Sequence, residues 1–333
     1  METAVILGAG FSLVAGLPLT RNLFDCGPTL PRAQSASAAE NNAQVNCAYQ
    51  QWKTEHPSAT AEEWLCELYE HRDDGLQEKL QGTTWDKAIR FALSRLVDLP
   101  KGSKSHYYFG ICTYRSHPVH SEFWARIEHE LHSRTVVTLN YDILVEQALH
   151  TGATTSRSAP RCYYGGFTHV QAVRKMTNII NKKYDLVQLG NDVTLYKLHG
   201  SVNWAWEQHS RTLKIHDDVR AVFRRNEDVG TPAIIPPIPE KEMPPEFSQI
   251  WWEARRSMMA CPRWLVCGYS LPPYDVVLHD FFAEILSHKM QAEILVLAPD
   301  SASLAARWEA IAPASTRIRA LPGLPEALLH KWT

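Results

Sequence analysis

The stretch Ala4-Val5-Ile6-Leu7-Gly8-Ala9-Gly10-Phe11-Ser12 decides the fold of this 333-residue chain. Its four consecutive apolar residues are typical of a strand buried on both faces of a parallel sheet. The glycine turn that follows is typical of a strand passing into a helix whose N-terminus can hold a diphosphate. The first glycine permits a tight turn, the second lets backbone approach phosphate, and Ser12 can donate a further hydrogen bond. Leu13 stands where the common dinucleotide fingerprint has its third glycine.

Two later segments also place polar side chains directly after apolar runs. They are Thr138-Leu139-Asn140-Tyr141-Asp142 and Lys197-Leu198-His199-Gly200-Ser201. Ligands of open α/β sheets bind at the carboxyl ends of the strands. The amide of Asn140, the carboxylate of Asp142 and the imidazole of His199 are therefore expected to converge on one nucleotide. We predict an α/β fold with a doubly wound, Rossmann-like parallel sheet.

The rest of the chain completes this sheet and adds an insertion to it. Further buried strands are predicted at Val193–Leu198, Arg263–Cys267 and Glu293–Leu297, where apolar residues run together. About a hundred residues of mainly helical character separate the first two strands. We therefore predict one domain over residues 1–333, with a helical insertion at residues 26–133 that can cap the ligand cleft.

Local patterns divide this insertion. Arg32–Gln51 is rich in Ala, Ser, Asn and Gln without an apolar period, which predicts a loop or weakly packed segment. Thr60 and Glu63 have the spacing of a capping box ahead of a helix. Apolar residues then recur at helical spacing within Trp85–Leu96 and again from Phe123 to Leu131, which predicts two more helices.

Composition narrows the function classes. Lys plus Arg number 34 against 36 for Asp plus Glu, a formal net charge of -2, so no overall positive field attracts nucleic acid. Seven cysteines without a C-x-x-C pair argue against a disulfide framework and a structural zinc site. Neither a targeting segment nor an apolar run of the ~20 residues that a membrane span needs is present. These features predict a cytoplasmic protein without membrane or direct nucleic-acid contacts.

Four short motifs follow one another along the chain: Gly8–Ser12, Gly16–Pro18, Asn140–Asp142 and Leu198–Gly200. In this order they resemble the motifs of the sirtuin superfamily, and most of all those of the bacterial sirtuin-like NAD hydrolases of antiphage defence. Gly268-Tyr269-Ser270-Leu271-Pro272, with Asp275 beyond it, resembles the late nucleotide-binding motif of that branch. The run Lys197–Trp204 is typical of the branch as well.

The resemblance implies that NAD is cleaved to nicotinamide and ADP-ribose with water as the acceptor. Protein-deacylating sirtuins usually carry two cysteine pairs that hold zinc, and this sequence has none. Leu19 and Thr20 replace their characteristic Asp and Phe, although Arg21 keeps the basic position. NAD is thus expected as a substrate, with no zinc or other metal.

The resemblance also implies roles for individual residues. Asn140 would hold a ribose hydroxyl or a water molecule, Asp142 would stabilise the cationic sugar or orient nicotinamide, and His199 would accept a proton. The residues expected to bind NAD are Gly8, Ala9, Gly10, Phe11, Ser12, Arg21, Gly268, Ser270 and Asp300.

Structural alternatives exist for the same residues. Asn140 and Asp142 can cap the following helix, His199 can be a hydrogen-bonded structural histidine, and Asp275 can oppose a helix dipole. At the level of function, the alternatives are a protein deacylase or ADP-ribosyltransferase, and a subunit that senses NAD or ADP-ribose without catalysis.

Regulation is expected to involve other chains. The resemblance implies an effector that defends bacteria by depleting NAD, and such an enzyme needs a resting state and a trigger. We therefore expect a homo-oligomer, with a separately encoded HerA-like ATPase or short Argonaute as a further partner.

Two other patterns receive less weight. His117 with His120, and His129 with His132, have metal-compatible spacing, but no further ligands complete a site. The tryptophan pairs Trp204 with Trp206 and Trp251 with Trp252 can stack on a base or line an interface, and buried packing explains them equally well.

Overall fold

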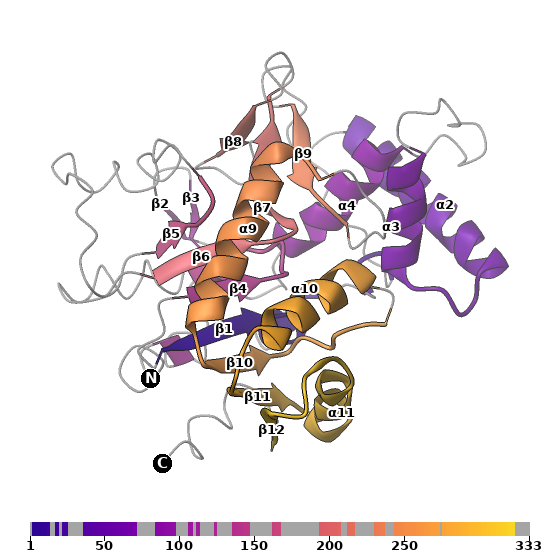
Figure 1. Cartoon of the computed structure of the whole chain (residues 1–333). Coiled ribbons are helices and arrows are strands. Elements are labelled where there is room, and N and C mark those ends of the chain that lie inside the picture. Colours follow the sequence, from indigo (N-terminus) through magenta and orange to yellow (C-terminus); the bar gives the residue numbers. More distant parts are fainter. Residues whose placement is uncertain are drawn as a thin grey trace, which may run out of the picture.

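The computed structural model shows a central sheet with helices packed against it (Figure 1). Helices α9 and α10 lie in front of the sheet in this view, and α2, α3 and α4 form a group at one side. The structure describes residues 2–13, 17–19, 22–25, 36–71, 84–97, 106–108, 111–113, 123–124, 135–146, 162–167, 193–207, 212–216, 230–236, 243–273 and 275–323.

The central sheet has seven strands in the order β12-β11-β10-β1-β4-β6-β5. Every neighbouring pair is parallel. The chain passes from β1 to β4 on one side and later returns to β10 on the other, so the sheet is doubly wound as predicted. The strands are β1 (Thr3–Leu7), β4 (Thr135–Thr138), β5 (Cys162–Tyr164), β6 (Val193–Lys197), β10 (Arg263–Cys267), β11 (Ala292–Ala298) and β12 (Thr316–Pro322).

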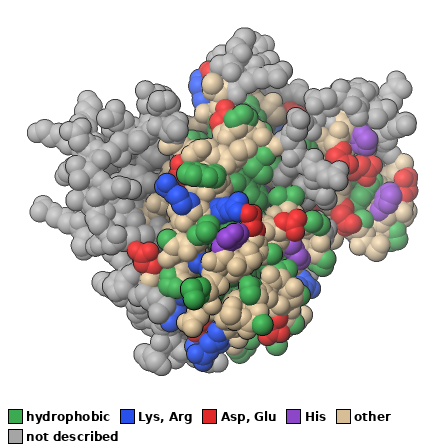
Figure 2. Space-filling model, in the orientation of Figure 1, with side chains coloured by type: hydrophobic (Ala, Val, Ile, Leu, Met, Phe, Trp, Pro, Cys, Tyr) green, Lys and Arg blue, Asp and Glu red, His purple; other side chains and the backbone are tan. Residues whose placement is uncertain are grey.

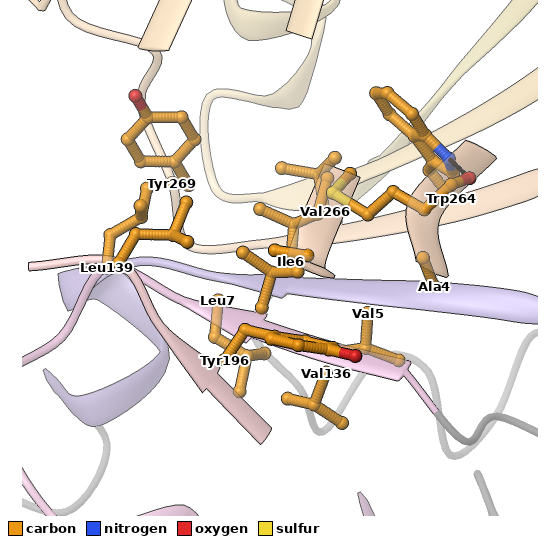
Figure 3. Close-up of a cluster of buried hydrophobic side chains, with 14 of the residues drawn as sticks. Ala4, Val5, Ile6, Leu7, Val136, Leu139, Tyr196, Trp264, Val266 and Tyr269 are labelled. Atoms are coloured by element: carbon orange, nitrogen blue, oxygen red, sulfur yellow. Dashed lines mark hydrogen bonds between the residues drawn. The ribbon is translucent and has the colours of Figure 1, made fainter. Parts of the chain in front are cut away.

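The first strand is buried along its whole length, which explains its unbroken apolar sequence. Side chains alternate between the two faces of the sheet, so Ile6 lies on the same face as Val266 of β10, while Val5 and Val136 lie on the other face (Figure 3). Because both faces are covered, neither set of side chains remains in water.

Three helices cover one face of the sheet: α9 (Pro245–Ala260), α10 (Val276–Ser287) and α11 (Ser301–Ile311). The indole of Trp264 on β10 packs edge-on against Phe282 of α10 and Trp308 of α11, with ring centroids 5.9 and 6.3 Å apart. Tyr196 of β6 shares a 2.7 Å hydrogen bond with Ser257 of α9. Large aromatic side chains thus join the helices to the sheet.

The second group of helices contains α2 (Ala36–Glu55), α3 (Ala61–Glu70) and α4 (Trp85–Val97). The prediction of a loop at Arg32–Gln51 is therefore wrong from Ala36 onward. Between residues 36 and 51, only Val45, Ala48 and Tyr49 are buried among the side chains described, so the apolar stripe is too thin to reveal a period. The surrounding Ala and Gln residues favour a helix without contributing to a hydrophobic pattern.

The other predicted features of this region are present where the structure describes them. The Thr60 hydroxyl accepts a hydrogen bond from the Glu63 amide at 3.3 Å, and the Glu63 carboxylate accepts one from the Thr60 amide at 2.5 Å, which confirms the capping box. Helix α4 begins at Trp85 as predicted. Of the helix predicted from Phe123 to Leu131, all but the first two residues lie outside the described part.

An aromatic cluster holds α2, α3 and α4 together. The ring of Phe24 lies 4.8 Å from that of Trp64 and 5.7 Å from that of Phe91, measured between centroids. This second hydrophobic core reaches the sheet region through Tyr141, Ile143, Val202 and Ile234. The segment that carries Asn140 and Asp142 therefore also contributes side chains to the helical core.

A smaller antiparallel sheet is inserted between β6 and β10 of the central sheet and was not predicted. It has the order β8-β7-β9, with β7 at Gly200–Trp206, β8 at Leu213–Ile215 and β9 at Thr231–Ile234. Strand β7 begins at the residue after His199, so its pairing fixes where that histidine lies. The remaining elements are α1 (Ala9–Leu13), β2 (His106–Tyr108) and β3 (Ile111–Thr113).

Charged groups of both signs are mixed over α9 and α10 in the space-filling view (Figure 2). None of the helices in the described stretches is both long and apolar enough to cross a bilayer.

Cysteine reactivity offers a direct check of this packing. Cys47 is exposed on α2, whereas Cys261 and Cys267 are buried. Burial raises the pKa of the Cys261 thiol and, more strongly, that of Cys267. Because the thiolate is the reactive form, we expect iodoacetamide at pH 8 to label Cys47 in the folded protein and both buried thiols only after denaturation. Peptide mapping by mass spectrometry measures each site, and equal labelling of Cys267 and Cys47 would contradict the packing.

Candidate functional site

Two loops meet at the carboxyl ends of the neighbouring strands β1 and β10. The Gly8 amide donates to the Cys267 carbonyl at 3.0 Å, and the Gly10 amide donates to the Gly268 carbonyl at 2.9 Å. A Cβ atom on Gly8 would lie only 2.5 Å from the Cα of Tyr269. The glycines therefore allow the two loops to approach each other closely.

Side chains from α1 and from the segment after β4 form a hydrogen-bonded network beside these loops. The Asn140 Nδ2 donates to the Gly8 carbonyl and to the Ser12 Oγ, both at 2.9 Å. The Ser12 hydroxyl in turn donates to Asp142 Oδ2 at 2.6 Å. All three side chains are buried. The structure therefore brings Gly8 and Ser12 together with Asn140 and Asp142, although the two pairs are more than 120 residues apart in sequence.

The network determines which way the Asn140 amide points. The Gly8 carbonyl can only accept a hydrogen bond, so the nitrogen of the amide must face it. Asn140 Oδ1 then lies on the other side of the amide, and no residue in the described part of the chain donates to it. This oxygen is an oriented acceptor for a hydroxyl group or a water molecule.

Asp142 performs part of the structural role expected as its alternative. Its Oδ1 accepts the Leu144 amide at 3.0 Å, while Oδ2 accepts the Ser12 hydroxyl. Both carboxylate oxygens are thus engaged by donors, and the side chain is only 7% exposed. The carboxylate is positioned to act through its charge rather than by direct contact with a ligand.

His199 follows β6 and lies between two aromatic rings. Its ring centroid is 6.4 Å from that of Tyr141 and 6.3 Å from that of Trp251. The Ile235 amide donates to the His199 carbonyl at 3.0 Å, and the Trp251 indole donates to the Leu198 carbonyl at 2.9 Å. The histidine is therefore held by backbone bonds on both sides and lies next to the Asn140–Asp142 segment.

The other residues expected to bind NAD differ in their exposure. Ala9 is partly exposed beside Gly10, whereas the ring of Phe11 is buried 4.9 Å from that of Phe123. Phe11 thus belongs to the core, and its backbone amide donates to the Gly8 carbonyl at 2.9 Å. Gly268 adopts a φ of 64° in direct contact with the Gly10 loop.

Ser270 and Asp300 are exposed and follow the carboxyl ends of β10 and β11. Arg307 of α11 donates to the Ser270 carbonyl at 2.8 Å, and Asp300 is the N-cap residue of α11. Both lie on the edge of the sheet where ligands bind, without a described contact to Asn140 or His199. Arg21 lies outside the described residues.

Asp275 has the structural role considered for it. It is buried and caps α10, where its carboxylate accepts the Leu278 amide at 3.4 Å. The tryptophan pairs have mixed roles: Trp204 and Trp251 are buried in the core, whereas Trp252 is 53% exposed on α9.

Sequence reasoning gave no role to a buried ion pair below the site. Lys197 Nζ lies 3.0 Å from Glu146 Oε1, and the Lys197 side chain is fully buried. One signal was available in the sequence, because Lys197 occurs within the predicted buried strand Val193–Leu198, where an unpaired charge is costly. Its partner was not identifiable, since Glu146 is 51 residues away.

Within the described stretches, no group of three or more His, Cys, Asp or Glu side chains is placed to hold a metal ion. The histidine pairs at residues 117–120 and 129–132 lie outside those stretches.

No family model and no curated protein matches the chain. Solved structures that resemble it are Sir2 homologues. A Sir2 homologue in complex with NAD matches with a TM-score of 0.48 and 12% identity, over 99% of this chain and 88% of that one. A Sir2 homologue in complex with ADP-ribose matches with a TM-score of 0.42 and 12% identity, over 95% and 86%. Because the TM-scores are below 0.5, the function proposed next rests on this chain's own residues.

Proposed function

We propose that this chain is an NAD glycohydrolase, which converts NAD and water to nicotinamide, ADP-ribose and a proton. The bond that breaks joins the nicotinamide nitrogen to the ribose, and positive charge develops on the sugar as nicotinamide leaves. A site for this reaction must bind the ribose, tolerate its positive charge and supply a base for the proton of the attacking water. The buried polar groups at the carboxyl edge of the sheet are suited to these tasks.

The observation that carries the proposal is the fixed orientation of Asn140. Its nitrogen is held by Gly8 and Ser12, which leaves Oδ1 as an oriented acceptor at the edge where ligands of such sheets bind. An amide does not titrate near neutral pH, so this acceptor keeps its character across the physiological range. Asn140 would hold a ribose hydroxyl or the attacking water in position.

His199 and Asp142 supply the remaining functions. An imidazole can accept a proton near neutral pH, and His199 lies beside the segment that carries Asn140. The Asp142 carboxylate, held by Ser12 and the Leu144 amide, contributes a nearby negative charge that favours a cationic sugar. The Gly8–Gly10 and Gly268–Ser270 loops would accept the diphosphate, with Arg21 and Asp300 as further NAD contacts.

Water is favoured over an acyl-lysine as the acceptor because of what the sequence contains. The cysteine pairs that hold zinc beside the acyl-lysine groove of deacylating sirtuins have no counterpart in this sequence. Hydrolysis also requires no binding surface for a second macromolecule.

Product analysis tests the proposal. Purified protein is incubated with NAD alone and with NAD plus an acetyl-lysine peptide, and nicotinamide, ADP-ribose and acetylated ADP-ribose are quantified by chromatography. We expect nicotinamide and ADP-ribose in equal amounts, formed at the same rate with and without the peptide, and an unchanged peptide mass.

Other outcomes would identify the alternatives. Nicotinamide release that requires the peptide, with loss of its acetyl group, would contradict hydrolysis and favour a deacylase. ADP-ribose attached to a protein would favour a transferase. Binding of NAD in calorimetry without any nicotinamide release, even with every partner protein present, would favour a sensor.

The biological setting is proposed from the sequence resemblance. Destruction of NAD by such an enzyme would serve bacterial antiphage defence, in a homo-oligomer and with a HerA-like ATPase or short Argonaute as partner. Light scattering of the purified protein at several concentrations measures its oligomeric state, and co-purification from the native host would identify a partner.

A further inference from the structure

A buried ion pair lies directly below the candidate site. Lys197 is the last residue of β6 and its side chain is 0% exposed, while the Glu146 side chain is 6% exposed. Moving two charges out of water costs several kcal/mol per ion, and a hydrophobic pair of similar volume is often equally stable. Stability alone therefore does not explain why charged residues occupy these positions.

The pair is connected to the segment that carries the proposed catalytic residues. Lys197 Nζ also donates to the backbone carbonyl of Asp142, and the Tyr164 hydroxyl donates to Glu146 Oε1 at 2.8 Å. The ammonium group thus binds both ends of the segment from Asp142 to Glu146. Tyr164 on β5 restrains the carboxylate from the neighbouring strand.

Lys197 is also close to His199 along the chain. The two residues are separated only by Leu198, whose amide donates to the Thr138 carbonyl at 3.2 Å. A shift of Lys197 would therefore move the end of β6 relative to β4, and with it the spacing between His199 and Asn140. Catalytic groups misplaced by about 1 Å can lose about 100-fold in rate.

We propose that the Lys197–Glu146 pair is a positioning device that holds Asn140 and His199 at their working separation. Lys197 and Glu146 are positioning residues and do not touch the substrate. The inference rests on the proposed NAD hydrolysis where kcat is measured. The measurement of hydrogen exchange does not depend on that activity.

The test uses the double variant Lys197→Met/Glu146→Leu, which removes both charges and leaves neither buried alone. We expect the thermal unfolding midpoint to fall by only a few degrees, because the bonds to the Asp142 carbonyl and from the Tyr164 hydroxyl are lost. We also expect a fall in kcat of about 100-fold and a change in KM of less than about threefold. Arg263→Met is the matched control. Arg263 forms a 3.0 Å ion pair with Glu293 at the amino ends of β10 and β11, away from the carboxyl ends where the site lies. Removing this pair should not change kcat.

Hydrogen exchange monitored by mass spectrometry provides the second readout. We expect the amides of residues 139–146 to exchange faster in the double variant, with β10 and β11 unchanged. Full kcat in a folded double variant, or unchanged exchange at residues 139–146, would overturn the inference. If the wild type does not hydrolyse NAD even with its partner present, the proposed function fails, and the exchange measurement still decides the positioning role.

Tyr164→Phe keeps the inference testable if the double variant does not fold. This variant removes only the hydroxyl that donates to Glu146, so no charge is left unpaired. We expect a fall in kcat of about tenfold and the same local increase in exchange. Wild-type kcat together with wild-type exchange in Tyr164→Phe would overturn the inference.

Discussion

Replacing His199 with Ala is expected to lower the rate of nicotinamide release by about a thousand-fold, because general base catalysis contributes factors of about 10² to 10⁴. The affinity for NAD should change by less than about threefold, since the adenosine and diphosphate contacts are proposed on other loops. Initial rates from product chromatography and dissociation constants from calorimetry measure the two effects separately.

His288→Ala is the matched control for this variant. His288 is exposed at the end of α10, where its ring is hydrogen-bonded to the Glu284 carbonyl and the Ser287 hydroxyl of the same helix. Its replacement should leave turnover unchanged. Full activity of a folded His199→Ala protein, with the wild-type circular dichroism spectrum, would exclude His199 as the base and reduce it to the structural histidine considered at the outset.

Replacing Gly268 with Val is expected to produce the largest loss of stability. At a φ of 64°, an L side chain is strained, and a Cβ would lie 2.2 Å from the Phe11 nitrogen and 2.5 Å from the Gly10 carbonyl carbon. The atoms it meets are backbone and cannot rotate away, so the β1 and β10 loops must separate. Backbone strain and overpacking together predict a loss of about 3 kcal/mol and a fall of about 4 °C in the unfolding midpoint.

Ser270→Val is the control, because it introduces the same side chain two residues later in the loop, where the residue is exposed. The midpoint of this control should stay within about 1 °C of the wild type. A wild-type midpoint for Gly268→Val would show that the two loops are not packed as described, and would also remove the close contact on which the glycine-lined site depends.

The strands of the central sheet were the most predictable part of the fold. Strands β1, β10 and β11 are buried along most of their length, so their sequences contain nearly continuous apolar runs. The positions of Asn140 and His199 followed from the same rule, because each comes directly after such a run. The capping box at Thr60 was equally clear, since it depends on two residues only three apart.

The features that could not be predicted from the sequence depend on packing between residues far apart in the chain. Helix α2 buries too few side chains to show a period, and the pairing of β7 with β9 joins segments whose sequences carry no reciprocal signal. Ser12 was expected to donate to phosphate, whereas its hydroxyl donates to Asp142, 130 residues away. Hydrogen-bond partners of this kind become visible only when the strands are in place.

The segment that follows β4 takes part in the polar network of the site and in a hydrophobic core at once. Asn140 and Asp142 join the network with Ser12, while Tyr141 and Ile143 are packed in the core of α2, α3 and α4. The helical group is consequently not a detachable module. Replacing the helical group by another insertion would change what Tyr141 and Ile143 pack against. Because Asn140 and Asp142 alternate with these two residues, a change in the helical core would also move the site.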